Sequence, residues 1–199
     1  YHTTVANTNF IITTETIFLA AFGYFFLKEK INLITFISII FGMSGVLLIL
    51  GSSLSIQSNE QFIGNIVAFL APISLAIFVI IIRKSPNVDM VPAQFIAGVF
   101  SAIFAYFIAS NLSISPHDLF LASLSGFFQI GFGFILITIG SQTTPSAVVG
   151  VLMLTEAVFG PLWAWLFINE MPPTSVLIGG GIIIFSILLQ SFYNKKNHF

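Results

Sequence analysis

The sequence contains no cysteine and very few charged residues. Without cysteine, a disulfide framework, a catalytic thiol and a thiolate metal site are all excluded. Charged residues make up 7% of the 199 residues, whereas soluble domains carry about a quarter. Hydrophobic residues make up 57%, and the mean hydropathy is +1.05. A soluble core of this length has no use for so much apolar surface, so the chain is predicted to be a membrane protein.

Mostly apolar segments of about 20 residues follow one another along the chain, a length that crosses a bilayer core as a helix. They lack the every-second-residue alternation of β-barrel strands. We therefore expect an all-α membrane protein with seven transmembrane helices. The predicted segments are residues 5–27, 31–51, 62–82, 91–110, 119–140, 147–168 and 176–192.

Positive charge predicts the orientation of the chain in the membrane. With seven crossings, every lysine and arginine falls on the same side. These residues are Lys28 and Lys30, Arg83 and Lys84, and Lys195 and Lys196. By the positive-inside rule that side is cytoplasmic. We expect a multi-pass protein of the cell (cytoplasmic) membrane with its C-terminus in the cytoplasm.

An acidic pattern occurs twice in the sequence, at an offset of 141 residues. Four of the seven acidic residues fall into two matched pairs. The matched positions include Glu15 with Glu156, Glu29 with Glu170, Thr14 with Thr155, and Phe18 with Phe159. Five helices separate the two copies, an odd number, so the copies cross the membrane in opposite directions. The pattern therefore predicts an inverted repeat of five helices, a common plan of transporters.

The inner acid of each pair is predicted to lie near the middle of the membrane. Glu15 precedes Glu29 by 14 residues, and Glu156 precedes Glu170 by the same number; this separation spans roughly 21 Å of helix. No Lys, Arg or His lies at that depth, and a low dielectric disfavours the ionised form. We expect each inner carboxyl to be protonated at rest and ionised only beside water or a cation, which suits a coupling or recognition group. The alternative is a neutral Glu hydrogen-bonded to a neighbouring helix.

Polar and aromatic residues share a helical face with these carboxyls. An aromatic wall beside a carboxylate suits an amphipathic solute with an amine. The alternative, packing against helices or lipid, is equally favoured for Phe18, Phe159 and Trp163. The outer acids, Glu29 and Glu170, are expected to cap neighbouring helices or to bind interfacial water rather than to contact substrate. The residues predicted to line a substrate path are Asn7, Thr14, Glu15, Phe18 and Phe22, together with Gln129, Thr155, Glu156, Phe159 and Trp163.

Local signals predict helix ends, kinks and packing seams. Pro92, Pro116 and Pro145 lie near first helical positions, and Thr174 is a predicted N-cap. Pro72 and Pro161 predict kinks. Small-residue faces predict packing seams in three segments: Ser38, Gly42 and Gly45; Gln94, Gly98, Ser101 and Ala105; and Ala122, Ser125, Gly126, Gly133 and Gly140.

The residues from 154 to 173 read LTEAVFGPLWAWLFINEMPP, and Gly179, Gly180 and Gly181 lie in the helix that follows. This resembles the end of an EamA-type repeat of the drug/metabolite transporter superfamily, in which a helix with Glu or Pro near its middle runs to a Gly-Glu-like turn. FLKEK at residues 26–30 is similar to the first-half version. Lys28 and Asn169 stand where the family usually has glycine. The resemblance covers essentially the whole chain and implies ten helices in two inverted halves (5+5), with export or exchange of small metabolites, amino acids or drugs.

The main hypothesis is a secondary transporter with Glu15 and Glu156 in a central cavity. A membrane-embedded enzyme with paired carboxylates and a non-transporting structural subunit are the alternatives. No catalytic, nucleotide or metal motif is present, so we expect no enzymatic activity, cofactor or metal. The expected partners are a small-molecule substrate, protons in a coupled mechanism, and the lipid bilayer, but not nucleic acid.

The repeat also predicts what precedes this chain in the gene. Residues 62–192 form a complete second repeat, residues 1–51 supply the last two helices of a first repeat, and residues 193–199 form a cytoplasmic tail. No basic segment precedes the first apolar stretch, so no signal peptide is predicted. The coding DNA upstream of Tyr1 should encode three more hydrophobic helices. Sequencing it tests the inverted repeat, and an upstream region without them would contradict it.

Overall fold

The computed structural model describes residues 5–51, 59–109, 113–169 and 171–197, and these ranges contain helices but no strand. Seven helical stretches in these ranges are long and apolar enough to cross a membrane. Each lies within a few residues of a predicted segment, so the predicted all-α membrane fold is confirmed. The stretches are Thr8–Leu27, Leu33–Leu50, Phe62–Lys84, Val91–Ile108, Pro116–Thr143, Ser146–Phe167 and Thr174–Tyr193.

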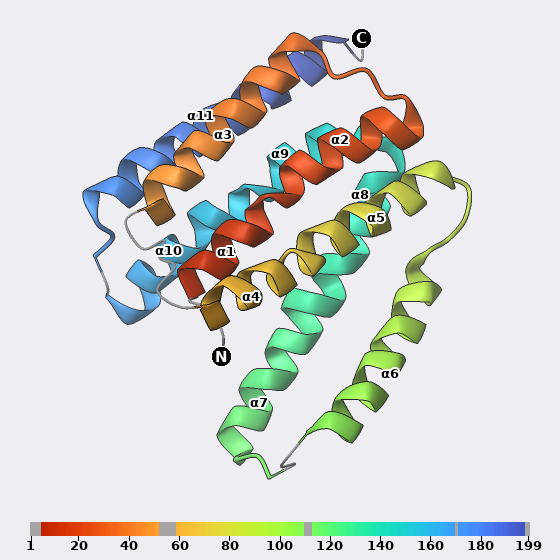
Figure 1. The fold of residues 1–199 in the computed structure, drawn as a ribbon, viewed down its shortest axis with the longest axis vertical. Coiled ribbons are helices and arrows are strands. Elements are labelled where there is room, and N and C mark those ends of the chain that lie inside the picture. Colours follow the sequence, from red (N-terminus) through yellow and green to blue (C-terminus); the bar gives the residue numbers. More distant parts are fainter. Residues whose placement is uncertain (1–4, 52–58, 110–112, 170, 198–199) are drawn as a thin grey trace. The chain divides into compact units, whose positions relative to one another are not determined.

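The helices form two compact units, Ile81–Thr143 and the remainder of the chain (Figure 1). The larger unit contains α1 (Val5–Thr13), α2 (Glu15–Leu27), α3 (Leu33–Leu50), α4 (Asn59–Ala68), most of α5 (Leu70–Lys84), α9 (Ser146–Met153), α10 (Thr155–Ile168) and α11 (Thr174–Asn197). The smaller unit contains α6 (Val91–Ile108), α7 (Pro116–Leu124), the π-helix η2 (Ser125–Phe132) and α8 (Gly133–Thr143).

Several helix starts follow the local sequence signals. Pro92 and Pro116 lie within the first two helical positions of α6 and α7, where a missing N–H costs nothing. The side chain of Asn32 accepts a hydrogen bond from the Thr35 N–H (2.8 Å) and caps α3. The prediction of Thr174 as an N-cap is wrong by one residue, because α11 already begins there.

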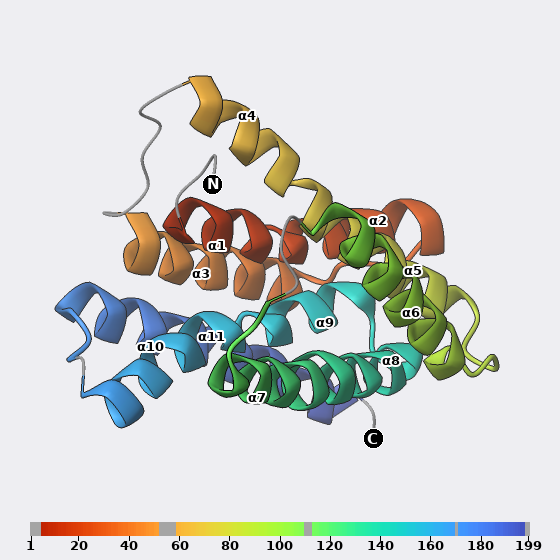
Figure 2. The ribbon, with the colours of Figure 1, turned by 90° about the horizontal axis from the view of Figure 1, so that it is seen from below.

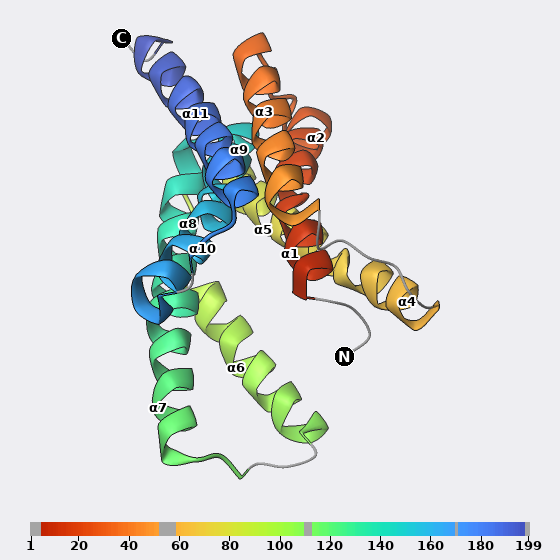
Figure 3. The same ribbon diagram turned by 90° about the vertical axis from the view of Figure 1, so that its left-hand side faces the viewer.

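In the larger unit, α3 and α11 run antiparallel and side by side (Figure 3). A Cβ built on Gly45 would lie 2.6 Å from the carbonyl oxygen of Gly179, and a Cβ on Gly179 would lie 2.6 Å from that of Gly45. Seven residues away along each helix, the Ser186 hydroxyl donates a hydrogen bond to the Ser38 carbonyl at 2.6 Å. At the 141-residue offset, Gly45 corresponds to Ser186 and Gly179 to Ser38. The two contacts are therefore repeat equivalents, and the seam predicted for α3 is confirmed.

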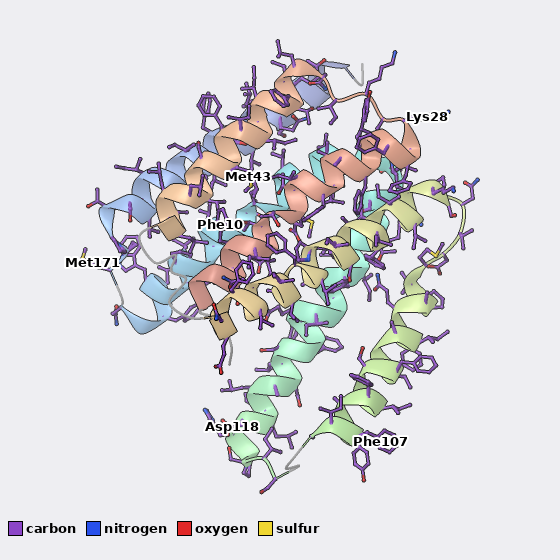
Figure 4. All side chains as sticks on the ribbon, viewed as in Figure 1. Phe10, Lys28, Met43, Phe107, Asp118 and Met171 are labelled. Carbon is purple, nitrogen blue, oxygen red and sulfur yellow. The ribbon has the colours of Figure 1, made fainter. Side chains whose placement is uncertain are left out.

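A small apolar core joins these two helices to α9. Val46, Ile49, Leu154 and Ile183 are buried together. Phe10 and Met43 pack against this cluster (Figure 4). The core fixes the end of α9, and therefore the start of α10, against the α3–α11 pair.

In the smaller unit, α7, η2 and α8 form one continuous helical path (Figure 2). The Gln94 side chain of α6 donates to the Thr138 hydroxyl and to the Phe134 carbonyl on α8. The predicted α-helix at residues 119–140 is wrong at its centre, where the π-helix changes which residues share a face. Gln94 apart, the two seams predicted for this unit have glycines that do not pack against described parts of the chain. A Cβ on Gly98, Gly126, Gly133 or Gly140 would meet nothing within 4 Å.

One of the two predicted kinks coincides with a break between helices. The third span breaks at Phe69, between α4 and α5, because Pro72 has no N–H to donate to the preceding turn. Pro161, in contrast, lies inside an uninterrupted α10. The sixth span breaks at Leu154, and the first breaks at Thr14. No proline or glycine predicts either of these two breaks.

The Gly45 contact leads to a stability prediction. Gly45→Ala places a methyl group against the Gly179 backbone, which cannot move without shifting α11. We expect a loss of about 1–3 kcal/mol in the free energy of unfolding, measured by SDS titration of the detergent-solubilised protein. Gly98→Ala is the matched control, since its Cβ meets open space, and it should leave stability unchanged or slightly raised. Equal effects of the two substitutions would contradict close packing at Gly45.

Candidate functional site

Glu15 is the first residue of α2 and directly follows a break in the first span. At the break, the Thr14 N–H donates to the Ile11 carbonyl (3.1 Å), three residues back rather than four. The Thr14 hydroxyl donates to the same carbonyl at 2.5 Å. This hydroxyl competes with the backbone for its acceptor, which bends helices. The carboxyl thus lies at a discontinuity within a membrane span.

The repeat copy of this helix breaks at nearly the same place. Leu154 separates α9 from α10, and the Ala157 N–H donates to its carbonyl, again three residues back (3.2 Å). The Thr155 hydroxyl donates to the Leu152 carbonyl at 2.8 Å. The repeated Thr-Glu pair therefore accompanies a repeated backbone distortion. Discontinuous spans at corresponding places of two inverted copies are typical of transporter binding sites.

The two inner carboxyls differ in their surroundings. Glu15 is 3% exposed, and its Oε2 atom has no hydrogen-bond partner in the described structure. Glu156, in the first turn of α10, is exposed. A buried, unsatisfied carboxyl oxygen is costly unless something else binds it. The two inner carboxyls therefore lie in different environments.

Aromatic rings follow each of the two carboxyls along its own helix. Phe18 and Phe22 are partly buried one and two turns after Glu15, with ring centroids 5.9 Å apart. Phe18 also meets the ring of Phe69 edge-on at 6.4 Å, at the break between α4 and α5. On α10, Phe159 and Trp163 are stacked at 6.2 Å and about half exposed.

Two predicted lining residues are not placed beside this group. Gln129 is exposed on η2 in the smaller unit. Asn7 belongs to α1, but its side chain is outside the described residues. Their assignment to a substrate path stays a prediction.

A contact between α2 and α9 lies next to Glu15 and was not predicted. The buried Thr16 hydroxyl donates to the Gly150 carbonyl at 2.9 Å. A Cβ on Gly150 would lie 2.9 Å from the Thr16 Cα, so the helices cross backbone to backbone. The repeat does not predict this contact, because the residues at the positions equivalent to Thr16 and Gly150 are Ala157 and Asn9.

The turn after α2 provides a second contact with α9. Lys28 (Figure 4) has a φ of 56°, and Asn169, at the equivalent position of the repeat, has a φ of 57°. This left-handed conformation favours glycine at a helix end, which accounts for the glycine that the resembled family has there. It brings Glu29 back toward the helix, so that its Oε2 accepts a hydrogen bond from the Ser146 N–H at 2.8 Å. Glu29 thus caps α9, as predicted; Glu170 lies outside the described residues.

The chain was compared with known families and relatives. The model of the EamA-like transporter family matches residues 1–51 and 62–192. A protein of Methanothermobacter thermautotrophicus named "Uncharacterized transporter" is 25% identical over 205 residues, covering 98% of this chain and 58% of the relative. A protein of Clostridium kluyveri with the same name is 24% identical over 196 residues, covering 94% and 63%. The chain therefore spans about three fifths of the length of the curated relatives it matches.

A solved crystal structure matches 96% of this chain and 69% of its own chain, with a TM-score of 0.80 and 16% identity. At that identity the likeness shows the fold alone. The family match covers most of the chain and includes both Thr-Glu pairs and the turn that contains Lys28 and Glu29. The chain belongs to the EamA-like transporter family.

Proposed function

We propose that this chain is the C-terminal part of a secondary transporter that exports or exchanges a small metabolite, amino acid or drug. Residues 1–51 supply the end of a first five-helix repeat, and residues 62–192 supply the second. The family match and the seven spans support this proposal. The distribution of Lys and Arg supports a cytoplasmic C-terminus in the cell membrane, with residues 193–199 as its tail.

One observation carries the proposal: a carboxyl oxygen of Glu15 is buried at a helix break without a hydrogen-bond partner in the described structure. A purely structural glutamic acid would be hydrogen-bonded, because an unsatisfied polar atom within a membrane span is unfavourable. In the proposed mechanism, the missing partner is a proton or the cationic group of a solute. Thr14, at the first break, and Thr155, directly after the second, hold the distortion through their hydroxyl groups.

In the proposed mechanism Glu15 and Glu156, which occupy matched positions of the repeat, stand near each other. Two neighbouring carboxyls do not readily ionise together. A proton or a solute amine at the pair relieves the repulsion, so each competes with the other for the site. The aromatic rings of Phe18, Phe22, Phe159 and Trp163 suit an amphipathic solute, because rings attract cations and offer apolar contact. We therefore propose a solute that carries an amine.

The alternatives have less support. A membrane-embedded enzyme using the two carboxyls would need a nucleophile, metal or cofactor motif that the sequence does not contain, and the family is one of transporters. A structural subunit leaves the unsatisfied Glu15 oxygen unexplained. No specific observation favours either of them.

The proposal is tested with the full-length protein in liposomes loaded with a defined mixture of amino acids and biogenic amines. Loss of each solute is followed by mass spectrometry at several pH values. We expect the wild-type protein to release at least one amine-bearing solute in a pH-dependent manner. Glu15→Gln and Glu156→Gln keep the side-chain volume but remove the exchangeable proton. We expect them to lower release at least about tenfold or to remove its pH dependence, because a hydrogen bond to a charged group contributes about 1.5–3 kcal/mol, which corresponds to a factor of that size or more.

Glu60→Gln is the matched control, because Glu60 is an exposed acid in the first turn of α4. It should release the same solutes as the wild-type protein. Unchanged rates and pH dependence in both Glu15→Gln and Glu156→Gln would remove the carboxyl pair from the mechanism. A wild-type protein that releases nothing from the mixture would contradict transport of this solute class.

A further inference from the structure

The two halves of the repeat are packed differently. At the 141-residue offset, α2 corresponds to α10 and α9 corresponds to α1. A symmetric arrangement would therefore pack α1 along α10 as closely as α2 along α9. Instead α2 lies along α9, whereas the described parts of α1 and α10 make no comparable contact and diverge (Figure 3). In an inverted-repeat protein, unequal packing of equivalent helices is the sign of one of two alternating states.

The close contacts lie between Glu15 and the end of the span that carries Lys28 and Lys30, which we call the basic end. Thr16 and Ser146 are fully buried there. A Cβ on Gly23 would lie 3.0 Å from the Ser146 Cβ and 2.9 Å from Glu29 Oε2. A solute cannot pass between helices packed at this distance. The path between α2 and α9 from the basic end to Glu15 is therefore closed.

Glu29 is the charged group in this closed contact. It follows the left-handed residue Lys28, and its carboxylate accepts from the Ser146 N–H at the N-terminus of α9. The first N–H groups of a helix have no partner within the helix, and the helix dipole favours a negative charge there. Separation of α2 from α9 breaks this bond, so the bond favours the closed arrangement.

We propose that Glu29 is a gate latch, which holds the basic end closed by capping α9. This inference rests on the proposed transport function. By the repeat, Glu170 corresponds to Glu29, Val5 to Ser146, and Ala164 to Gly23. From this correspondence alone, replacement of Glu170 is predicted to shift the two ends in the opposite direction to replacement of Glu29.

The absence of cysteine from the chain gives a direct test. Thr16→Cys places a thiol at a fully buried position of the closed contact, and Ala157→Cys places one at the equivalent position on α10. Each variant of the full-length protein is labelled in oriented membrane vesicles with a charged methanethiosulfonate, applied from one side at a time. The labelling rate at position 16 from the basic end reports opening of that end, and the rate at position 157 from the other side reports opening there.

In the Thr16→Cys background, Glu29→Ala should raise labelling at position 16 about tenfold, because a charge-assisted cap of about 1.4 kcal/mol shifts a two-state equilibrium by that factor. Glu29→Gln keeps an acceptor without charge and should have a smaller effect. Glu170→Ala should act in the opposite direction, lowering labelling at position 16 and raising it at position 157. Lys30→Ala is the matched control, since Lys30 is exposed in the same turn, and it should change neither rate.

Opposite shifts for Glu29→Ala and Glu170→Ala distinguish a latch from a structural role, because general destabilisation would raise both labelling rates. If both variants raise both rates, or change neither, the latch is wrong while alternating access still stands. If the thiol at position 16 stays unlabelled in every variant and the thiol at position 157 is labelled at one constant rate, the two ends do not alternate, and the proposed transport mechanism fails as well.

Discussion

Backbone-to-backbone contact between antiparallel helices is the constraint on which the larger unit depends. In a bilayer, lipid offers apolar side chains as good an environment as another helix does, so helices associate through close packing and hydrogen bonds. Glycines at positions 45, 150 and 179 leave no room for a Cβ at these crossings. Serine and threonine hydroxyls at 16 and 186 donate to carbonyls across the same contacts. The α3–α11 pair thereby joins the two repeats, and the α2–α9 pair sets the position of Glu15.

The chain is symmetric in sequence but not in environment, and the difference has a physical basis. The α2–α9 crossing uses Thr16 and Gly150, whereas the corresponding positions hold Ala157 and Asn9. The same sequence pattern therefore closes one end more readily than the other. Glu15 is buried next to the closed crossing, while Glu156 is exposed on the diverging α10. In the proposed mechanism these surroundings exchange when the opposite end closes, so that each carboxyl is alternately covered and accessible.

The helical spans follow from apolar runs of about 20 residues, and prolines mark several of their starts, so sequence alone was sufficient for them. A capping role for Glu29 also followed from sequence, since an acid at the end of one span lies at the level where neighbouring helices begin, but its partner α9 did not. The breaks at Thr14 and Leu154 could not be predicted from the sequence. They arise where threonine hydroxyls bond to backbone carbonyls of the preceding turn, and not at a proline. The contact between Thr16 and Gly150 could not be predicted, because the equivalent positions of the other repeat hold different residues. The left-handed conformation of Lys28 and Asn169 could not be predicted either, because neither residue is glycine.

The central claim is that the Glu15 carboxyl lies on the path of the transported solute. Reaction with a hydrophobic carbodiimide, which modifies neutral carboxyls in membranes, tests it most directly when the modified peptides are quantified by mass spectrometry. The account predicts modification of Glu15 that decreases as a transported amine is added and that does not decrease at Glu60. Modification of Glu15 that is the same at every concentration of that amine would contradict it.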